Sequence, residues 1–164
     1  MRPTADIYDE YGEAAESCST QFRHFGARTE FEGVVTTVRC RDDNVLLRAV
    51  LGEAGGGRVL VVDGGGSLDT ALIGDVIAGL AAANGWEGLV VFGAVRDVDA
   101  LGRIPLGVKA LGSNPRKSRK QGLGDVDVDV SFGGVTFRPG CRVFSDTDGI
   151  LVLRATEGIR AVSG

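Results

Sequence analysis

The sequence is poor in the residues on which many catalytic and metal-binding motifs depend. It contains one histidine, one tryptophan and three cysteines, and no cysteine pair has the CxxC spacing. The lone histidine, His24, supports neither a zinc site nor a catalytic triad, so we expect it to have a structural or surface role. Cys18, Cys40 and Cys141 are odd in number and widely spaced, which favours buried free thiols in a reducing compartment.

Long apolar runs and an excess of basic charge are also absent. No apolar stretch approaches the roughly 20 residues that span a bilayer, and the first residues lead into an acidic segment rather than a signal peptide. The net charge of -4 and the pI near 5.0 argue against a general nucleic-acid binder, which needs a basic face. We therefore expect a cytoplasmic protein that binds neither a membrane nor nucleic acid directly.

Glycine, in contrast, is abundant. The 26 glycines gather at the ends of apolar runs, where they mark turns. A chain of 164 residues that is 43% hydrophobic is long enough to bury one core. We expect a single domain over residues 1–154 and a mobile tail over residues 155–164.

Alternation of apolar runs with turn residues predicts an α/β fold with six to eight strands and three to four helices. Helices are expected at residues 4–11, with Thr4 as the N-cap, and at 45–51, 76–83 and 98–101. Strands are expected at residues 31–39, 58–63, 88–93, 108–111, 125–130, 135–137, 142–145 and 150–153. Helices would flank a central β-sheet, and the last strands would form a C-terminal β layer.

Residues 57–97 form the unit around which the rest is arranged. A strand, a helix opening at Gly74 and Asp75, and a second strand imply a parallel crossover. Asp75 then shares the carboxyl edge of the sheet with Arg96 and Asp97, which follow the second strand. A helix N-terminus, a guanidinium and two carboxylates meet there, so the pattern predicts an anion site beside a cation site. A structural ion pair between aspartate and arginine is an equal alternative on pattern alone.

Three further motifs have weaker functional interpretations. The glycines of residues 64–66 do not match GxGxxG, and no acidic residue ends the following strand, which argues against a dinucleotide or S-adenosylmethionine site. The basic run 116–120 suggests RNA or phosphate contact, but without interleaved aromatic residues an exposed loop is favoured. The alternating aspartates of residues 125–130 lack the glycine and glutamate of a calcium loop, so a half-buried strand with an acidic face is favoured.

Five blocks of the sequence form a recognisable set: GGSLDTALIGD at 65–75, NGWEG at 84–88, GAVRDVD at 93–99, ALGSNPRKS at 110–118 and GGVTF at 133–137. Together they resemble the RraA family over about residues 4–153. That family includes regulators of ribonuclease activity and shares a superfamily with the class II 4-hydroxy-4-methyl-2-oxoglutarate aldolases. The resemblance implies a swivelling β/β/α domain and a ring-shaped homotrimer.

The aldolase branch is marked by an aspartate, twenty residues, and then Arg-Asp. Asp75 and the pair Arg96-Asp97 have this spacing. The resemblance implies that Asp75 and Arg96 are catalytic, that Arg96 faces the keto oxygen, and that Asp97 binds Mg²⁺ or Mn²⁺ largely through waters. It also implies that a substrate carboxylate is held by the backbone amides of Gly74, Asp75, Val76 and Ile77.

Such a site would be a metal-dependent lyase that cleaves a 4-hydroxy-2-oxo acid or decarboxylates oxaloacetate. Both reactions leave a pyruvate enolate, whose negative charge a metal and an arginine would stabilise. The full aldolases carry a C-terminal extension with an acidic residue that enters a neighbouring subunit's site, and Glu157 is the candidate for it here. The alternative is a trimeric non-catalytic regulator that binds and inhibits an RNase E-type endoribonuclease.

Overall fold

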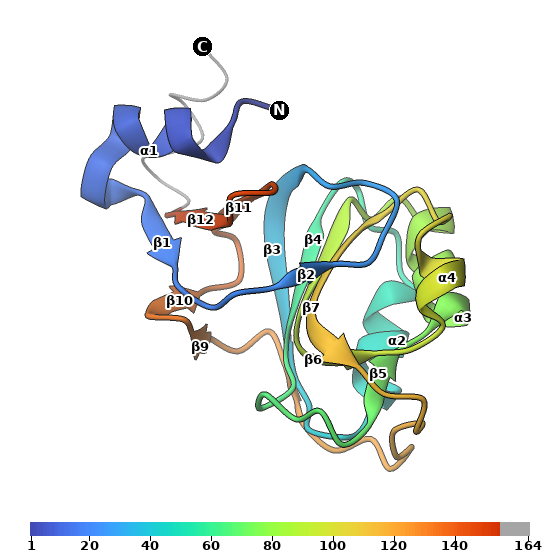
Figure 1. Cartoon of the computed structure of the whole chain (residues 1–164). Helices are drawn as coiled ribbons and strands as arrows, with labels where there is room; N and C mark the ends of the chain where they lie inside the picture. The colour runs from blue at the N-terminus through green and yellow to red at the C-terminus, as the bar shows by residue number, and fades with distance from the viewer. Residues whose placement is uncertain (155–164) are drawn as a thin grey trace.

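The computed structural model of the chain describes residues 1–154 and shows a mixed α/β fold (Figure 1). The predicted mobile tail, with Glu157, lies outside the described residues. The described helices are α1 (Thr4–Tyr11), the 3₁₀ helix η1 (Gly12–Ala14), α2 (Val45–Leu51), α3 (Asp75–Ala83) and α4 (Val98–Leu101). The strands are β1 (Glu16–Cys18), β2 (Arg23–His24), β3 (Phe31–Arg39), β4 (Val59–Asp63), β5 (Ala71–Ile73), β6 (Gly88–Val95), β7 (Gly107–Ser113), β8 (Asp125–Val126), β9 (Val130–Phe132), β10 (Val135–Phe137), β11 (Arg142–Ser145) and β12 (Ile150–Leu153).

The centre of the fold is a parallel sheet that is extended on both sides by antiparallel strands. Strands β3, β4, β6 and β7 are neighbours, and each pairs in parallel with the next. Beyond β3 the sheet continues through β11, β12 and β1, while β2 lies at the other edge and β9 pairs with β10 separately. Helices α2, α3 and α4 lie together on one side of the parallel strands (Figure 1). The predicted α/β fold with a C-terminal β layer is therefore confirmed.

Strand β4 shows why the sheet is covered on both faces. Its residues are almost all apolar and buried, as expected for a strand of a parallel sheet with layers above and below it. Leu60 and Val62 belong to the core cluster under the helices, with Leu47 and Ala78. Val59 belongs to the opposite cluster, which the aromatic residues of the C-terminal strands fill. The sheet is thus the middle layer of the molecule.

The long elements agree well with the sequence prediction. Strand β3 and helix α2 have the predicted bounds, and β4, α3 and β6 form the predicted parallel crossover. The predicted number of strands was too low, because twelve occur over residues 1–154. The missed strands β1, β2 and β5 have two or three residues, too few for a periodic pattern. All three cysteines are free and buried, as predicted.

The predicted strand over residues 125–130 was wrong. Only Asp125 and Val126 pair with β3, and the chain then turns at Asp127, whose φ of 58° is left-handed. Pairing resumes at Val130, in the separate β9–β10 hairpin. Val126, expected on a buried face, is 38% exposed. Period-two alternation was therefore no evidence for a continuous strand, because a single left-handed aspartate redirects the backbone.

The predicted N-cap of α1 was also wrong. Pro3 occupies the cap position, and Thr4 is the first helical residue. Both the backbone N–H and the hydroxyl of Thr4 donate to the carboxylate of Asp146, each at 2.7 Å. A residue 142 positions away in the sequence therefore takes the role that the local pattern assigned to Thr4. Among the described helices, none is both long and apolar enough to cross a bilayer.

Candidate functional site

The site lies at the carboxyl edge of strands β5 and β6. Strand β5 ends at Ile73, and Gly74 leads directly into α3, while β6 delivers Arg96 and Asp97 to the same edge. The N–H of Arg96 donates to the carbonyl of Ile73 at 2.9 Å, which joins the two strand ends. Asp75 and the Arg96-Asp97 pair, predicted to share this edge, are thus neighbours.

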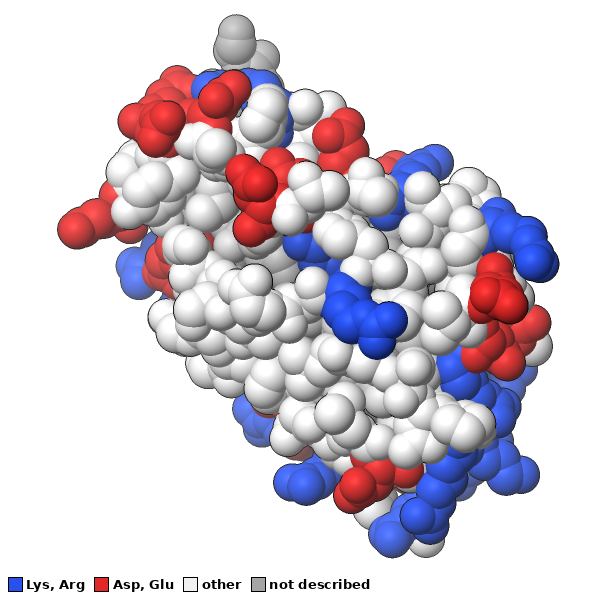
Figure 2. Space-filling view, in the orientation of Figure 1, with Lys and Arg blue, Asp and Glu red and all other residues white. Residues whose placement is uncertain are grey.

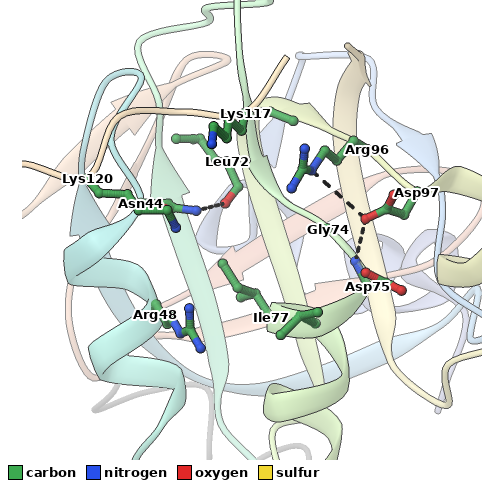
Figure 3. A pocket seen from close by; sticks show the side chains of 12 residues that line it. Asn44, Arg48, Leu72, Gly74, Asp75, Ile77, Arg96, Asp97, Lys117 and Lys120 are labelled. Carbon is green, nitrogen blue, oxygen red and sulfur yellow. Dashed lines mark hydrogen bonds and ion pairs between the residues drawn. The ribbon is translucent and has the colours of Figure 1, made fainter. Parts of the chain in front are cut away.

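The carboxylate of Asp97 contacts both the side chain of Arg96 and the backbone of Asp75 (Figure 3). Its Oδ2 accepts a hydrogen bond from the backbone N–H of Asp75 at 3.1 Å and lies 4.0 Å from Nε of Arg96. Both side chains are about two-fifths exposed, at 42% for Arg96 and 40% for Asp97. A long, exposed ion pair of this kind contributes little to the stability of the fold, which weakens the alternative of a purely structural ion pair.

The backbone at Asp97 is unusual for a residue with a side chain. Its φ of 57° and ψ of 46° are left-handed, a conformation that aspartate tolerates better than most residues. The turn starts α4, whose first bond runs from the N–H of Leu101 to the carbonyl of Asp97. It also brings the carboxylate against α3, where a Cβ on Gly74 would lie 2.5 Å from Oδ2 of Asp97. Glycine at position 74 is therefore a condition for this geometry.

A pocket of about 190 Å³ opens beside these groups. All six predicted site residues line it: Gly74, Asp75, Val76, Ile77, Arg96 and Asp97. The sequence prediction missed the other lining residues, which are Asn44, Arg48, Ala71, Leu72, Lys117 and Lys120. Asn44 and Arg48 lie across the pocket from Asp75 and Asp97 (Figure 3). The two ends of the pocket thus come from different crossovers of the sheet.

The missed residues make the pocket strongly cationic. Arg48 comes from α2, while Lys117 and Lys120 come from the segment between β7 and β8. With Arg96 and the N-terminus of α3, they favour an anionic ligand. The position of the lysines could have been predicted from the topology, because β7 runs parallel to β6 and the segment after β7 must emerge at the same edge of the sheet. The basic side chains of the run 116–120 are exposed, as predicted, but Ser118 between them is buried, and Lys117 and Lys120 line the pocket.

The residues of the pocket fit a metal site that is completed by water, and they do not fit a site built from three or more protein side chains. Within residues 1–154, no group of three or more histidine, cysteine, aspartate or glutamate side chains is arranged to hold a metal ion. Asp75 and Asp97 nevertheless line one pocket, and Oδ1 of Asp97 accepts no hydrogen bond from the described residues. In proteins Mg²⁺ is commonly coordinated by one or two carboxylates, and water and substrate oxygens complete its coordination. The donor set therefore fits a water-rich Mg²⁺ or Mn²⁺ site.

The glycine run after β4 has no part in this pocket. It leads through an irregular segment into strand β5, whereas a dinucleotide site needs a glycine turn that opens directly into a helix. The N–H of Gly65 instead donates to the carboxylate of Asp63 at 2.9 Å.

Comparisons with known proteins identify the family and the fold of the chain. A family model described as RraA-like, Aldolase/RraA, matches residues 4–152. The structure of the RNA-processing inhibitor RraA from Thermus thermophilis is 46% identical, with a TM-score of 0.92 and 98% of each chain covered. A structure from Geobacillus kaustophilus, described as an S-adenosylmethionine: 2-dimethylmenaquinone methyltransferase, is 40% identical, with a TM-score of 0.92 and coverage of 94% of this chain and 96% of that one.

A more distant similarity is to Streptomyces coelicolor RraAS2, described as an unusual member of the RNase ES inhibitor RraA protein family. It is 27% identical, with a TM-score of 0.79, and the match covers 97% of this chain and 83% of that chain. The family match covers nearly the whole described structure, including every predicted site residue. The chain belongs to the RraA-like family, Aldolase/RraA.

Proposed function

We propose that this protein is a divalent-metal-dependent lyase of the 4-hydroxy-4-methyl-2-oxoglutarate aldolase and oxaloacetate decarboxylase type. The observation that carries the proposal is the meeting of Asp75, Arg96 and Asp97 in one cation-lined pocket at the start of α3. A pocket with this charge suits a small oxo acid with more than one carboxylate. The RraA-like family includes divalent-metal-dependent members.

The residues have distinct roles in this proposal. The amides at the start of α3 bind the carboxylate next to the keto group, and the guanidinium of Arg96 faces the keto oxygen. Asp97 would hold Mg²⁺ or Mn²⁺, which when bound would supply positive charge to the oxygens that become negative. In oxaloacetate the bond to the departing carboxylate breaks, CO₂ leaves, and its electron pair remains on the pyruvate enolate. Protonation of the enolate carbon then gives pyruvate.

Arg48, Lys117 and Lys120 account for the second carboxylate of such substrates. Arg48 and Lys120 lie on the side of the pocket opposite Asp97, and Lys117 lies between Lys120 and Arg96 (Figure 3), so the far end of an acid with a four- or five-carbon backbone would reach them. In the free protein the N–H of Asp75 is already bonded to Asp97. A substrate carboxylate would compete with Asp97 for this amide, and Asp97 would hold a metal through Oδ1, which accepts no hydrogen bond from the described residues.

The test is the release of pyruvate from oxaloacetate and from 4-hydroxy-4-methyl-2-oxoglutarate, with Mg²⁺ and then with EDTA. Turnover should need the metal and should fall about 10²–10³-fold in Arg96→Ala and in Asp97→Ala, the usual loss for a transition-state stabilising group. Arg103→Ala removes an exposed arginine outside the pocket and serves as the control. Turnover no faster than with the metal alone, or unchanged in both site variants, would contradict the proposal.

A second candidate function is favoured by the comparisons. Two similar structures are described as an RNA-processing inhibitor and as a member of an RNase ES inhibitor family. On this hypothesis the protein is a homotrimer in the cytoplasm that binds and slows an RNase E-type endoribonuclease. Cleavage of an RNA substrate by the purified ribonuclease should then slow as this protein is added. Equal cleavage rates at all protein concentrations would count heavily against it.

A further inference from the structure

The basic segment that supplies the two pocket lysines is held against the body of the protein. We name residues 114–122, which make up most of the connection between β7 and β8, the basic strap. At its start, the side chain of Asn114 donates to the carbonyl of Leu68 at 2.8 Å, and the N–H of Ala71 donates to the carbonyl of Arg116 at 2.7 Å. The strap is therefore fixed at the end that leaves β7, beside β5.

The far end of the strap is held by the segment before α2. The N–H of Arg119 donates to the carbonyl of Asp42 at 2.7 Å, and the N–H of Asn44 donates to the carbonyl of Arg119 at 3.2 Å. Residues Asp43 and Arg119 thereby form an isolated parallel bridge. Lys120 lies directly after this bridge, so its position depends on how firmly the bridge and the next residues are held.

The side chain that closes this end is the carboxylate of Asp43, which is 1% exposed. Its Oδ2 accepts from the N–H of Gln121 at 2.8 Å, and its Oδ1 accepts from the N–H of Gly122 at 3.2 Å. Oδ1 also accepts from the N–H of Val45 at 3.1 Å, in the first turn of α2. One buried carboxylate thus joins the start of α2 to the end of the strap.

We propose that Asp43 is a positioning residue for the candidate site: by holding the basic strap against the start of α2, it places Lys117 and Lys120 over the pocket. The proposal rests on the proposed function, because it assigns the lysines to the second carboxylate of the substrate. Asp43 does not line the pocket and acts only through the strap. Lys120, next to Gln121, depends on Asp43 more than Lys117, which follows the separately held Arg116.

The negative charge of Asp43 is the essential property. A carboxylate offers only acceptors to the three surrounding N–H groups, and hydrogen bonds to an ionised acceptor are about twice as strong as neutral ones. Burial raises the pKa of Asp43, but the hydrogen bonds from backbone N–H groups outweigh it, and its pKa lies below the ordinary value. Asparagine has the same shape, but its NH₂ group would face at least one backbone donor.

The first experiment measures the strap without any need for activity. Native Asp43→Asn and the wild-type protein are digested with trypsin, and cuts after Arg119 and Lys120 are followed by mass spectrometry. Cleavage there should be about tenfold faster in Asp43→Asn, the effect of losing charge-assisted hydrogen bonds. Asp129→Asn, which changes an exposed carboxylate that lies 3.9 Å from Arg138, is the matched control and should behave as wild type.

Hydrogen exchange separates this local effect from a loss of the fold. In Asp43→Asn the amides of Gln121 and Gly122 should lose protection, while the amides of β4 and β6 keep theirs. Loss of protection in all of these segments together, or unchanged cleavage of the strap, would overturn the proposal whatever the activity.

The second experiment measures the consequence for the site. The KM for oxaloacetate should rise about tenfold in Asp43→Asn without a fall in kcat, because the far carboxylate is the one that leaves as CO₂ and loses its negative charge in the transition state, so the lysines bind the ground state more tightly. A mobile strap with an unchanged KM would overturn the positioning role. Absence of turnover in the wild-type protein would instead count against the proposed function. In that case the affinity for 2-oxoglutarate, measured by titration calorimetry, replaces KM, and an affinity equal in both proteins overturns the proposal.

Discussion

Gly74 and Asp97 show how much of the candidate site depends on single backbone positions. The absence of a Cβ at position 74 leaves the space that the carboxylate of Asp97 occupies. The left-handed backbone at Asp97 then directs that carboxylate toward the first amide of α3. The left-handed backbone at Asp97 is a strained position, and such positions are common at functional sites. Both positions can be tested with matched substitutions.

Gly74→Ala should reduce metal-dependent pyruvate release strongly while leaving the protein folded. The new methyl group would lie 2.5 Å from Oδ2 of Asp97 and 3.3 Å from Cγ of Arg96, so both side chains must move. Gly79→Ala, within α3, is the control, because a Cβ at position 79 would meet nothing within 4 Å. That control should keep its activity and gain about 0.5–1 kcal/mol of stability. Equal activity in the two variants would show that Asp97 need not lie where the structure places it.

Replacement of Asp97 should separate its chemical role from its backbone role. Asp97→Asn and Asp97→Ala should both lose metal-dependent turnover, because neither offers a carboxylate. Asparagine tolerates the left-handed conformation and alanine does not, so Asp97→Ala should be less stable than Asp97→Asn by about 1–2 kcal/mol. Urea unfolding of the two variants measures this difference. Equal free energies of unfolding would mean that the turn relaxes without cost.

At the scale of elements, the loop that follows α2 is joined to the end of α3 by one arginine. The guanidinium of Arg58 lies 4.7 Å from the centre of the Trp86 ring. Its three nitrogens donate to the carbonyl of Gly55 at 2.9 Å, the hydroxyl of Thr36 at 3.0 Å and the carbonyl of Ala54 at 3.0 Å. These contacts hold together the segments that enter β4 and β6 opposite the site.

Arg58→Lys should therefore destabilise the protein by about 2 kcal/mol although it keeps the charge. A single ammonium cannot reproduce the planar arrangement of three donors over an indole ring. Thermal and urea unfolding provide the measurement. The control is Arg138→Lys, since that arginine is 45% exposed and its ion pair with Asp129 is 3.9 Å long. A loss no larger than that of the control would mean that the contacts of Arg58 add little to stability.

At the scale of the whole molecule, the net charge of -4 conceals an uneven distribution. Acidic side chains gather at the end of the molecule that carries α1, and basic side chains gather near the opposite end (Figure 2). Exposed basic residues include Arg41, Arg116, Lys117, Arg119 and Lys120, from the two segments that the Asp43–Arg119 bridge joins. Composition alone therefore gave no indication that an acidic protein presents a cationic pocket.

Three carboxylates should make the stability of the protein sensitive to acid. The pKa values of Asp42, Asp43 and Asp146 all lie below the ordinary 3.8, because hydrogen bonds to each carboxylate outweigh the opposing effect of burial. A folded-state pKa below the unfolded value stabilises the fold above pH 3.8, and the gain is lost as the pH falls through the folded-state value. The free energy of unfolding should therefore decrease as the pH is lowered below 3.8.

Urea unfolding between pH 7 and pH 3 measures this dependence. In Asp43→Asn one of the three groups no longer titrates, so the loss of stability on acidification should be smaller than in the wild-type protein. The same loss in both proteins would contradict the contribution assigned to Asp43.

The proposed assembly gives a further prediction at this scale. A homotrimer should have a mass in solution three times the chain mass of 17.1 kDa, independent of concentration in the micromolar range. Light scattering coupled to size-exclusion chromatography measures it directly. A monomer mass at every concentration would exclude the trimer, and with it the trimeric regulator.

The sequence by itself determined the long elements and the presence of the aspartate and Arg-Asp motif. Strand β3, helix α2 and the β4–α3–β6 crossover follow from local propensity and apolar periodicity, which act over a few residues. The shared edge of Asp75, Arg96 and Asp97 then follows from the direction of parallel strands. The turn at Asp127 and the capping of α1 by Asp146 could not be read in the same way, because both depend on residues or conformations that leave no periodic signal.

Only the tertiary structure decided which further residues complete the pocket. Arg48, Lys117 and Lys120 belong to segments that are distant in sequence from Asp75, and each has the exposed, basic character of an ordinary surface residue. Their position depends on parallel pairing of four strands and on one buried carboxylate, that of Asp43, which joins two loops. Long-range pairing and a shared hydrogen-bond acceptor act between segments, and for that reason no local pattern in the sequence reveals them.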